Sequence, residues 1–375
     1  MTKARTNASA SPAVGRNMVI NGAMNVAQRA TSVTGIGANA DSYFTIDRFK
    51  LNPASTDGRL TMTQTADGPN GISANCLKLD CTTADTSIAA GEALVLSTYL
   101  EGQNVQRLGK GVAGAKQSVI SFYVKASSSL TFAVELFDSD HARHIVKLFT
   151  ATTGWNRIEF NVPADVDDGS SPLNDDNGSS LSINFWLHGG SNFTGGTLAT
   201  AWANKTNNNT RAAGIDSFFS STDNNFFLTG LQFEVGPVAT EFEQEDISTT
   251  LAKCQRYFAI IKGTSDSAYQ RFSRGHCFST TSAPMGAFLP QNLRAFPSLG
   301  STGTPADYHV NNGSATTVLS ANPSLDNGSD FFVDGTTCNH VNFTATCSSG
   351  LTEGRGCSLN GNNSADAFIS FDAEL

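Results

Sequence analysis

The chain is marked by short apolar runs in which hydrophobic side chains occupy every second position. Because successive side chains of a strand point to opposite faces of a sheet, this period of two predicts half-buried strands. Clusters of Gly, Asn, Asp and Ser separate the runs, which favours a sandwich or jelly roll over a parallel sheet with crossover helices. The alternating apolar positions are Ile120, Phe122 and Val124; Leu130, Phe132, Val134 and Leu136; Ile158, Phe160 and Val162; Leu181, Ile183, Phe185 and Leu187; and Phe227, Leu231, Phe233 and Val235.

One segment has a helical rather than a strand period. Ile247, Leu251 and Cys254 follow one another at i, i+4 and i+7, behind acidic residues that suit a helix N-terminus. This spacing predicts a helix of about three turns. An apolar strand at 257–261 and a linker at 263–267 are expected to follow it.

We therefore expect a mainly β protein with four parts. These are an N-terminal arm (1–16), a jelly-roll β-sandwich (17–243), a connecting helix, strand and linker (244–267), and a smaller C-terminal β-sandwich (268–375). Prolines punctuate the last part, which predicts short or edge strands. Its strand candidates are His276 to Phe278, Met285 to Leu289, Thr316 to Leu319, Phe331 to Val333, Val341 to Thr346 and Ala367 to Phe371.

Charge and composition limit the kinds of molecule that the chain is expected to bind. The formal net charge is −9 and the 24 Lys and Arg are scattered singly, which disfavours binding to nucleic acid. No segment approaches the roughly 20 apolar residues of a membrane span, so no membrane insertion is expected. The opening residues lack the apolar core of a secretory signal. The chain has seven cysteines, and this odd number does not suit a framework of disulfides. Most of them are expected to be small buried thiols.

Two tryptophans and one histidine, Trp186, Trp202 and His188, are the candidate sugar-binding residues. Trp186 lies on the polar face of its predicted strand, opposite Leu187 and near His188, and Trp202 lies in the loop GGTLATAWANKTNN. An outward Trp can stack on the apolar face of a sugar ring while neighbouring polar groups bind its hydroxyls. The alternative is that such a Trp packs against another subunit.

Carboxylates crowd the segment VPADVDDGSSPLNDDNG. Calcium accepts about six to eight oxygen ligands, so this segment is a weak candidate calcium site, against the alternative of a solvated turn. No cofactor is otherwise expected. The candidate ligands are Asp165, Asp167, Asp168, Asp175 and Asp176.

Other polar groups have a structural interpretation beside a functional one. Asp47 and Arg48 could touch a ligand, but Arg48 is expected to satisfy a carboxylate or strand-end carbonyls. His141 and His144 share the turn DSDHARH with two aspartates, which raises the question of a catalytic triad or a metal. No catalytic motif accompanies them, and we expect no enzyme activity.

Several stretches resemble tail-fibre-like virion proteins of bacteriophages, in particular of marine phages. RNMVINGAMNVAQRATS (16–32) and SYFTIDRFKL (42–51) are similar to the opening of that group, although Phe49 stands where Trp is common. FFLTGLQFEVGPVATEFEQEDISTTLAKCQRYF (226–258) is similar to the block that closes its jelly roll, and the C-terminal stretches at 283–299 and 351–375 are similar to its second β domain.

The resemblance implies a jelly roll like that of carbohydrate-binding modules, in a homotrimeric virion protein. The expected role is a tail fibre or adhesin that contacts host surface glycans or lipopolysaccharide. The N-terminal arm, with Lys3, Arg5 and Arg16, is expected to attach it to other virion proteins. The alternative is a purely structural virion component, such as a capsid decoration or a connector.

Overall fold

A computed structural model describes residues 15–37, 39–166, 172–205, 208–263, 268–313, 315–326, 331–332 and 338–375. The chain divides into two compact units, Met1–Thr250 and Leu251–Leu375, and each is described by itself. The division falls inside helix α4 (Ile247–Gln255), so the connecting segment expected at 244–267 is shared between the units.

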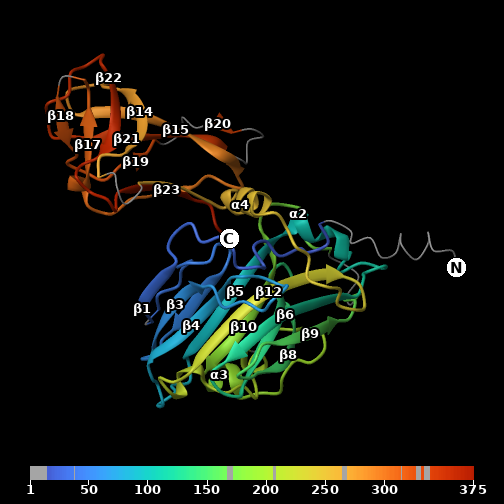
Figure 1. The fold of residues 1–375 in the computed structure, drawn as a ribbon. Helices are drawn as coiled ribbons and strands as arrows, with labels where there is room; N and C mark the ends of the chain where they lie inside the picture. The colour runs from blue at the N-terminus through green and yellow to red at the C-terminus, as the bar shows by residue number, and fades with distance from the viewer. Residues whose placement is uncertain are drawn as a thin grey trace. The chain divides into compact units, whose positions relative to one another are not determined.

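The first unit consists of two six-stranded antiparallel sheets (Figure 1). In order across the sheet, the first contains β1 (Ser32–Ile36), β3 (Arg59–Thr65), β4 (Cys76–Thr83), β12 (Asn225–Val235), β6 (Ser118–Ala126) and β9 (Asn156–Val162). The second contains β11 (Ala203–Asn204), β8 (Arg143–Ala151), β7 (Leu130–Asp138), β10 (Ser179–Gly189), β5 (Ala93–Glu101) and β2 (Lys50–Ala54).

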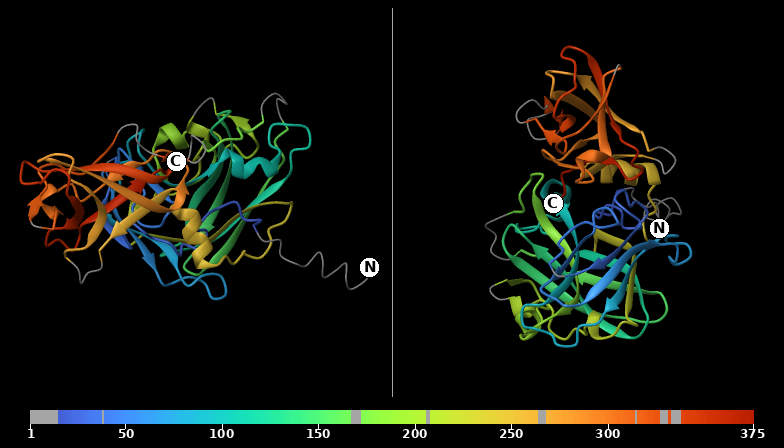
Figure 2. Two further views of the ribbon diagram at one scale, coloured as in Figure 1. Left: turned by 90° about the horizontal axis from the view of Figure 1, so that it is seen from above. Right: turned by 90° about the vertical axis from the view of Figure 1, so that its left-hand side faces the viewer.

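The two sheets face each other across one hydrophobic core (Figure 2). Phe122 of β6 contacts Phe149 of β8 and Phe185 of β10 edge to face, with ring centroids 5.2 and 5.0 Å apart. Such pairs join the inner faces of the two sheets and stabilise the core beyond the effect of burying the rings. The mainly β jelly-roll sandwich that the alternation predicts is confirmed.

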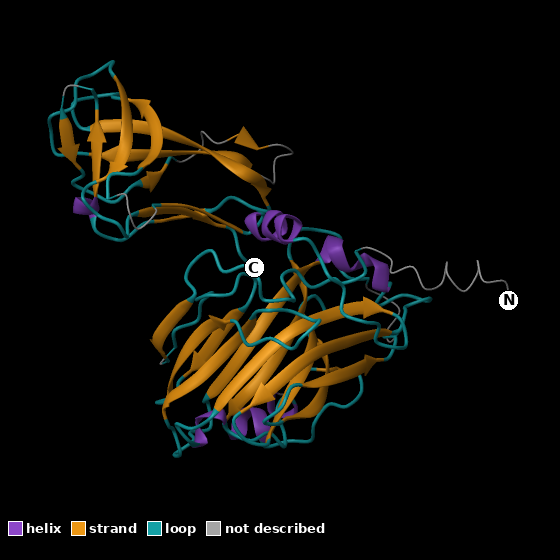
Figure 3. Ribbon diagram, viewed as in Figure 1, coloured by secondary structure: helices purple, strands orange, loops and turns teal. Residues whose placement is uncertain are grey.

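Helices are short and lie in the connections between consecutive strands (Figure 3). No helix among the described residues is long and apolar enough to span a membrane. The short helices of the first unit are α2 (Gly102–Val105), η1 (Gln106–Leu108), α3 (Ser191–Thr194), η2 (Asn208–Thr210) and η3 (Phe218–Ser220).

A β-bulge in β12 corrects one expectation. Phe227 was expected on the same face as Leu231 and Phe233, but those two lie in the core while Phe227 contacts Trp155 outside it. The pairing of β12 with β6 shifts between Thr229 and Gln232, so residues before and after the shift differ in phase.

The described start of the chain is bound to the end of the same unit. The Arg16 guanidinium donates to the carbonyl of Glu241 (2.6 Å), and the amide of Asn17 donates to the carboxylate of Glu243 (2.8 Å). Arg16 therefore belongs to the folded unit, where an attachment arm was expected. Lys3 and Arg5 lie outside the described residues.

Asp47 and Arg48 have the structural role expected of them. Arg48 is fully buried and donates to the carbonyl of Tyr99 in β5 (2.7 Å). The Asp47 carboxylate accepts hydrogen bonds from the backbone and side-chain nitrogens of Gln28. These contacts fix the loop that leads into β2.

The second unit also has two antiparallel sheets around one core. The smaller contains β13 (Phe258–Lys262), β23 (Phe368–Asp372) and β16 (Ser298–Gly300). The larger contains β18 (Thr316–Val318), β17 (Tyr308–Asn311), β22 (Gly356–Gly361), β14 (Arg271–His276), β15 (Ser282–Leu293), β21 (Cys338–Thr346), β19 (Ser324–Leu325) and β20 (Phe331–Phe332), and η4 (Pro305–Asp307) precedes β17.

Three sequence expectations change in detail here. The strand expected at His276 to Phe278 lies earlier in the chain, because β14 ends at His276. Pro284 and Pro290 do not shorten their strand, because both lie within the twelve-residue β15. β14 pairs with this strand only at Met285 and Gly286, so Pro284 lies beyond that pairing. In α4, Cys254 is buried as predicted, but Ile247 is 53% exposed.

The cysteines follow the prediction. The six whose side chains are described are all free and buried, at Cys76, Cys81, Cys254, Cys277, Cys347 and Cys357. Burial is the largest cause of a raised pKa at Cys76, to about 11, and at Cys357, to about 12.

Candidate functional site

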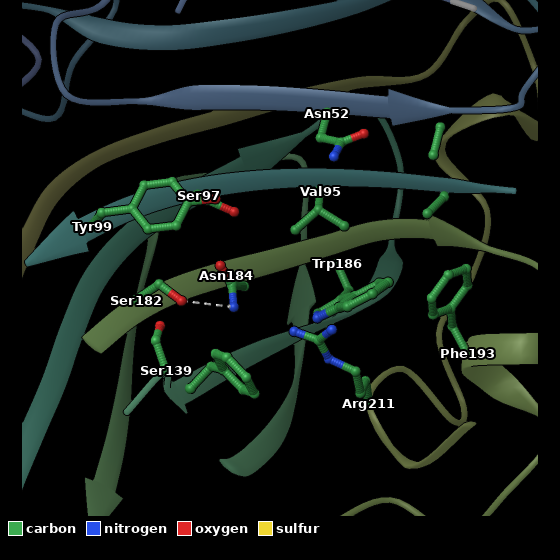
Figure 4. Close-up of a pocket in the computed structure, with 13 residues that line it drawn as sticks. Asn52, Val95, Ser97, Tyr99, Ser139, Ser182, Asn184, Trp186, Phe193 and Arg211 are labelled. Atoms are coloured by element: carbon green, nitrogen blue, oxygen red, sulfur yellow. Dashed lines mark hydrogen bonds between the residues drawn. The ribbon is translucent and has the colours of Figure 1, made fainter. Parts of the chain in front are cut away.

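A groove of about 300 Å³ lies on the outer face of the second sheet of the first unit (Figure 4). β5, β10 and β7 each face the core with one set of alternate residues and the groove with the other. The loop that carries α3 covers part of this face through a small hydrophobic cluster with Trp186 and Phe193. The groove is lined by Asn52, Ala54, Ala93, Val95, Ser97, Tyr99, Phe137, Ser139, Ser182, Asn184, Trp186, Phe193 and Arg211.

Side-chain size explains why the face is hollow. Small residues such as Ser97 and Ser182 occupy the outward positions of the central strands. Tyr99 is paired with Ser182, and Ser182 is paired with Phe137 on the other side. The two half-buried rings therefore flank a floor of small residues, about two strand spacings or 10 Å apart.

One carboxylate organises the polar groups beneath the groove. Glu135 of β7 is fully buried, and Arg211 donates to both of its oxygens at 2.8 and 2.7 Å. Trp186 Nε1 and Asn184 Nδ2 each donate to Glu135 Oε2 at 3.0 Å, and His144 Nδ1 lies 2.9 Å from Oε1. These five contacts fix the orientation of the groove side chains.

The charge of Glu135 is stabilised by these donors. Burial alone would raise its pKa, but the Arg211 charge and the hydrogen bonds from His144, Arg211 and Trp186 outweigh it and lower the pKa to about 2. Glu135 is therefore a permanent anion at neutral pH, and its oxygens are occupied by protein donors.

The histidines of the DSDHARH turn are separated by the fold. His141 Nδ1 lies 3.0 Å from Asp138, whereas His144 contacts Glu135 and, through Nε2, Thr210 at 3.3 Å. His144 is fully buried, so this chain of carboxylate, imidazole and hydroxyl does not face the solvent. It supports the orientation of the Glu135 network.

The structure brings only one of the three predicted sugar-binding residues to the groove. Trp186 lines it, but Arg211 lies over its ring at 4.7 Å, so the ring face is covered. His188, on the same strand, is fully buried and contacts Glu92 (3.1 Å) and Ser217 (2.8 Å). Trp202 does not line the groove. Its ring packs against the core, and its Nε1 donates to the carbonyl of Pro163.

The candidate calcium ligands divide in the same way. Asp165 is engaged by Arg143 through both oxygens at 2.9 Å and by Lys110 at 2.9 Å. These hydrogen bonds lower its pKa despite burial, which would raise it. Asp165 therefore serves an ion-pair network. Asp175 and Asp176 belong to a described segment, whereas Asp167 and Asp168 lie outside the described residues.

A different group of residues has the composition of a metal site. The ligand atoms of Asp85, Glu92 and His188 lie within 4.8 Å of one another, and all three residues are buried. Two carboxylates and an imidazole suit a zinc-type ion. Each already has protein partners. Asp85 accepts a hydrogen bond from Thr56 at 2.9 Å, and Glu92 accepts one from the amide of Ala89 at 2.8 Å. His188 contacts the Ser217 hydroxyl at 2.8 Å.

Sequence reasoning missed most of the groove. Tyr99 and Phe137 carry a usable signal, because each is an aromatic residue in the outward phase of an alternating strand. Arg211 lies in a loop and Phe193 in the short helix α3, and no local pattern indicates that they fold over this sheet.

No family model matches the chain, and no curated protein does. The enzymatically active domain of tailspike protein 4 of bacteriophage CBA120 is a structural match with a TM-score of 0.30 and 10% identity over 59% of this chain and 22% of that one.

Isolated binding modules match the chain to a similar extent. A family 11 carbohydrate-binding module of Clostridium thermocellum, solved with a mixed-linked tetrasaccharide, gives a TM-score of 0.26 at 13% identity over 56% of this chain and 99% of that one. A cellulose-binding domain of Cellulomonas fimi gives 0.28 at 12% identity, over 51% and 90%. TM-scores this low do not define the fold, which follows from the strand pairing described above.

Proposed function

We propose that the chain is a bacteriophage virion adhesin whose first unit binds a saccharide in the groove without transforming it. The single observation that carries this proposal is the floor of small residues flanked by the half-buried rings of Tyr99 and Phe137. Aromatic rings pack on the apolar face of a sugar, and hydroxyls and amides such as those of Ser139 and Asn52 bind its rim.

Binding without hydrolysis is favoured by the groove's own chemistry. Glycoside hydrolysis generally uses a pair of carboxylates that flank the scissile bond. The described residues that line the groove include no Asp or Glu, and Glu135 beneath them is occupied by protein donors.

The biological setting is proposed from the sequence resemblance described above. We place the chain in the virion as a homotrimeric tail fibre or similar adhesin, with host glycan or lipopolysaccharide as its partner. A trimer would multiply weak sugar contacts by raising their effective concentration. A capsid decoration or a connector is the competing role.

Binding of the purified protein to host polysaccharide tests the proposal. Replacing either flanking ring, as Tyr99→Ala or Phe137→Ala, is expected to weaken binding roughly tenfold, which corresponds to about 1.4 kcal/mol. The matched control is Tyr123→Ala, because Tyr123 is a half-buried aromatic residue of β6 in the opposite sheet.

The outcomes separate the candidate roles. Equal binding by wild type and both groove variants would remove the groove from the proposal. Absence of saccharide binding, with retention on phage heads, would favour the decoration role. Release of reducing ends from the polysaccharide would show that the protein is an enzyme.

A further inference from the structure

The charge of the groove points to a class of saccharide, and this inference rests on the proposed function. Arg211 is the one charged side chain among the described residues that line the groove. The whole chain carries a formal charge of −9, so a cation at this position runs against the average of the protein.

Arg211 is held rigidly from one side. Its Nε and one Nη2 hydrogen are donated to Glu135, and its guanidinium lies over the rings of Trp186 (4.7 Å) and Phe137 (5.1 Å). The loop of Arg211 is itself fixed, since the amide of Ala212 donates to the carbonyl of Phe193 at 3.0 Å. A group fixed in this way loses little conformational freedom when it binds a ligand.

The opposite edge of the guanidinium faces the groove. An arginine has five N–H donors, and two of these are used by Glu135. The other three, on Nη1 and Nη2, have no hydrogen-bond acceptor among the described residues, and the side chain is 16% exposed. In Figure 4 the guanidinium lies beside Trp186 and points toward the middle of the groove, where Asn184 lies.

Further cations stand at both flanking rings. Lys205 Nζ lies 5.4 Å from the centroid of the Phe137 ring. Lys50 Nζ lies 6.0 Å from that of Tyr99, although Asp41 pairs with it at 3.0 Å. Glu101 follows Tyr99 on the same face but is fully buried. The accessible charge at the groove is therefore positive, which attracts anionic ligands.

We propose that the groove selects saccharides that carry a carboxylate, bound end-on by Nη1 and Nη2 of Arg211 while Tyr99 and Phe137 flank the sugar. A planar guanidinium edge matches a carboxylate through two parallel hydrogen bonds, which a sugar hydroxyl cannot reproduce. The carboxylate belongs to a hexuronic or a nonulosonic acid unit, and both present the same group to Arg211.

A panel of uronate, nonulosonate and uncharged glycans tests this, each acidic glycan being paired with its carboxyl-reduced form. Carboxyl reduction keeps the linkage and ring and removes only the charge. We expect the bound glycans to be carboxylated, reduction to weaken binding about tenfold or more, and added salt to weaken the acidic form alone. The two acidic arms show which acid is the source.

Variants assign the effect to Arg211. Because Arg211→Gln alone leaves the buried Glu135 without its arginine partner, it is measured beside the double variant with Glu135→Gln. Both are expected to bind an acidic glycan no better than its reduced form. Arg211→Lys keeps the charge without the fork and should retain part of the preference. Lys78→Gln, on β4 of the opposite sheet, is the charge control and should bind as wild type.

The failures of this inference and of the proposed function are distinguishable. Equal binding of acidic and reduced glycans, or binding of uncharged glycans alone, would overturn the carboxylate preference and leave saccharide binding intact. A preference that survives in both glutamine variants would remove Arg211 from the selection. Binding of no glycan in any arm would overturn both.

Discussion

Glu135 shows how much a single side chain in an alternating strand can determine. Its position in β7 faces away from the core, where exposure would be expected, but the loop of Arg211 covers it. The result is a buried carboxylate with five hydrogen-bond donors. Removing one partner of a buried ion pair destabilises a protein far more than removing one partner of an exposed pair. The shape of the groove therefore depends on the ionisation of a residue that does not line it.

Acid is expected to destabilise the first unit through Glu135. The folded pKa is lowered from the ordinary value of 4.5 to about 2, so this stabilisation is present above pH 4.5 and is lost as the pH falls toward 2. The shift corresponds to about 3 kcal/mol. Urea unfolding from pH 7 to 2.5 should show the Glu135→Gln variant less stable at pH 7, with the gap to wild type closing below pH 4.5.

An exposed carboxylate provides the comparison for this pH series. Glu159 of β9 is 46% exposed on the outer face of the other sheet and pairs with Arg157 at 3.4 Å. Glu159→Gln should follow the wild-type pH curve within about 0.5 kcal/mol. A gap between wild type and Glu135→Gln that stays constant down to pH 2.5 would contradict the assignment.

Local patterns predict only part of the groove at this scale. The outward phase of Trp186 follows from its alternating strand, and the groove confirms it. His188 was expected beside Trp186, but the pairing of β10 with β5 shifts between these two residues, and His188 contacts Glu92 and Ser217 in the interior. Arg211 makes its defining contact with a residue 76 positions away, and no local sequence pattern reports a contact at that distance.

Among the strands, β12 carries the most consequential irregularity. Gly230 has φ +61°, and a Cβ there would approach Tyr123 Cδ2 to 2.8 Å and Ile72 Cγ2 to 2.9 Å. The bulge needs both the backbone freedom and the small size of glycine at this position. It reverses the phase of the strand, so Phe226 and Leu228 share the core with Leu231 and Phe233.

Gly230→Ala is expected to destabilise the first unit by about 2–3 kcal/mol, because a positive φ and two close contacts add together. Gly71→Ala is the matched control, since Gly71 has φ +78° but nothing within 4 Å of its Cβ position. Gly71→Ala should lower the free energy of unfolding by about 1 kcal/mol. Urea unfolding gives both values, and equal losses would show that the contacts at Gly230 relax freely.

Strands are better predicted than their irregularities. The five alternating runs all form strands, because a half-buried strand must repeat its apolar positions every second residue. The bulge at Gly230 was not predicted, because an isolated glycine in a strand does not show whether the strand pairing shifts there. The prolines of β15 led to a wrong prediction of short or edge strands. A strand tolerates proline where its neighbour does not pair with it, and the sequence does not show where β14 stops pairing.

At the scale of the whole chain, the groove belongs to one unit. Its strands and the covering loop all lie within Met1–Thr250. We expect a fragment of residues 15–246 to fold alone and to bind a monovalent saccharide with the affinity of the full chain, within about twofold. Calorimetry and titration of both proteins check this. An affinity loss of tenfold or more in the folded fragment would assign part of the site to the second unit.

Residues 15–17 and 231–243 are joined by hydrogen bonds, so the polypeptide enters and leaves the first unit at the same place. A module with adjacent termini can be transplanted into a surface loop of an unrelated scaffold without stretching either partner. Recombination between genomes could exchange such a cassette whole, and a protein engineer could graft it in the same way.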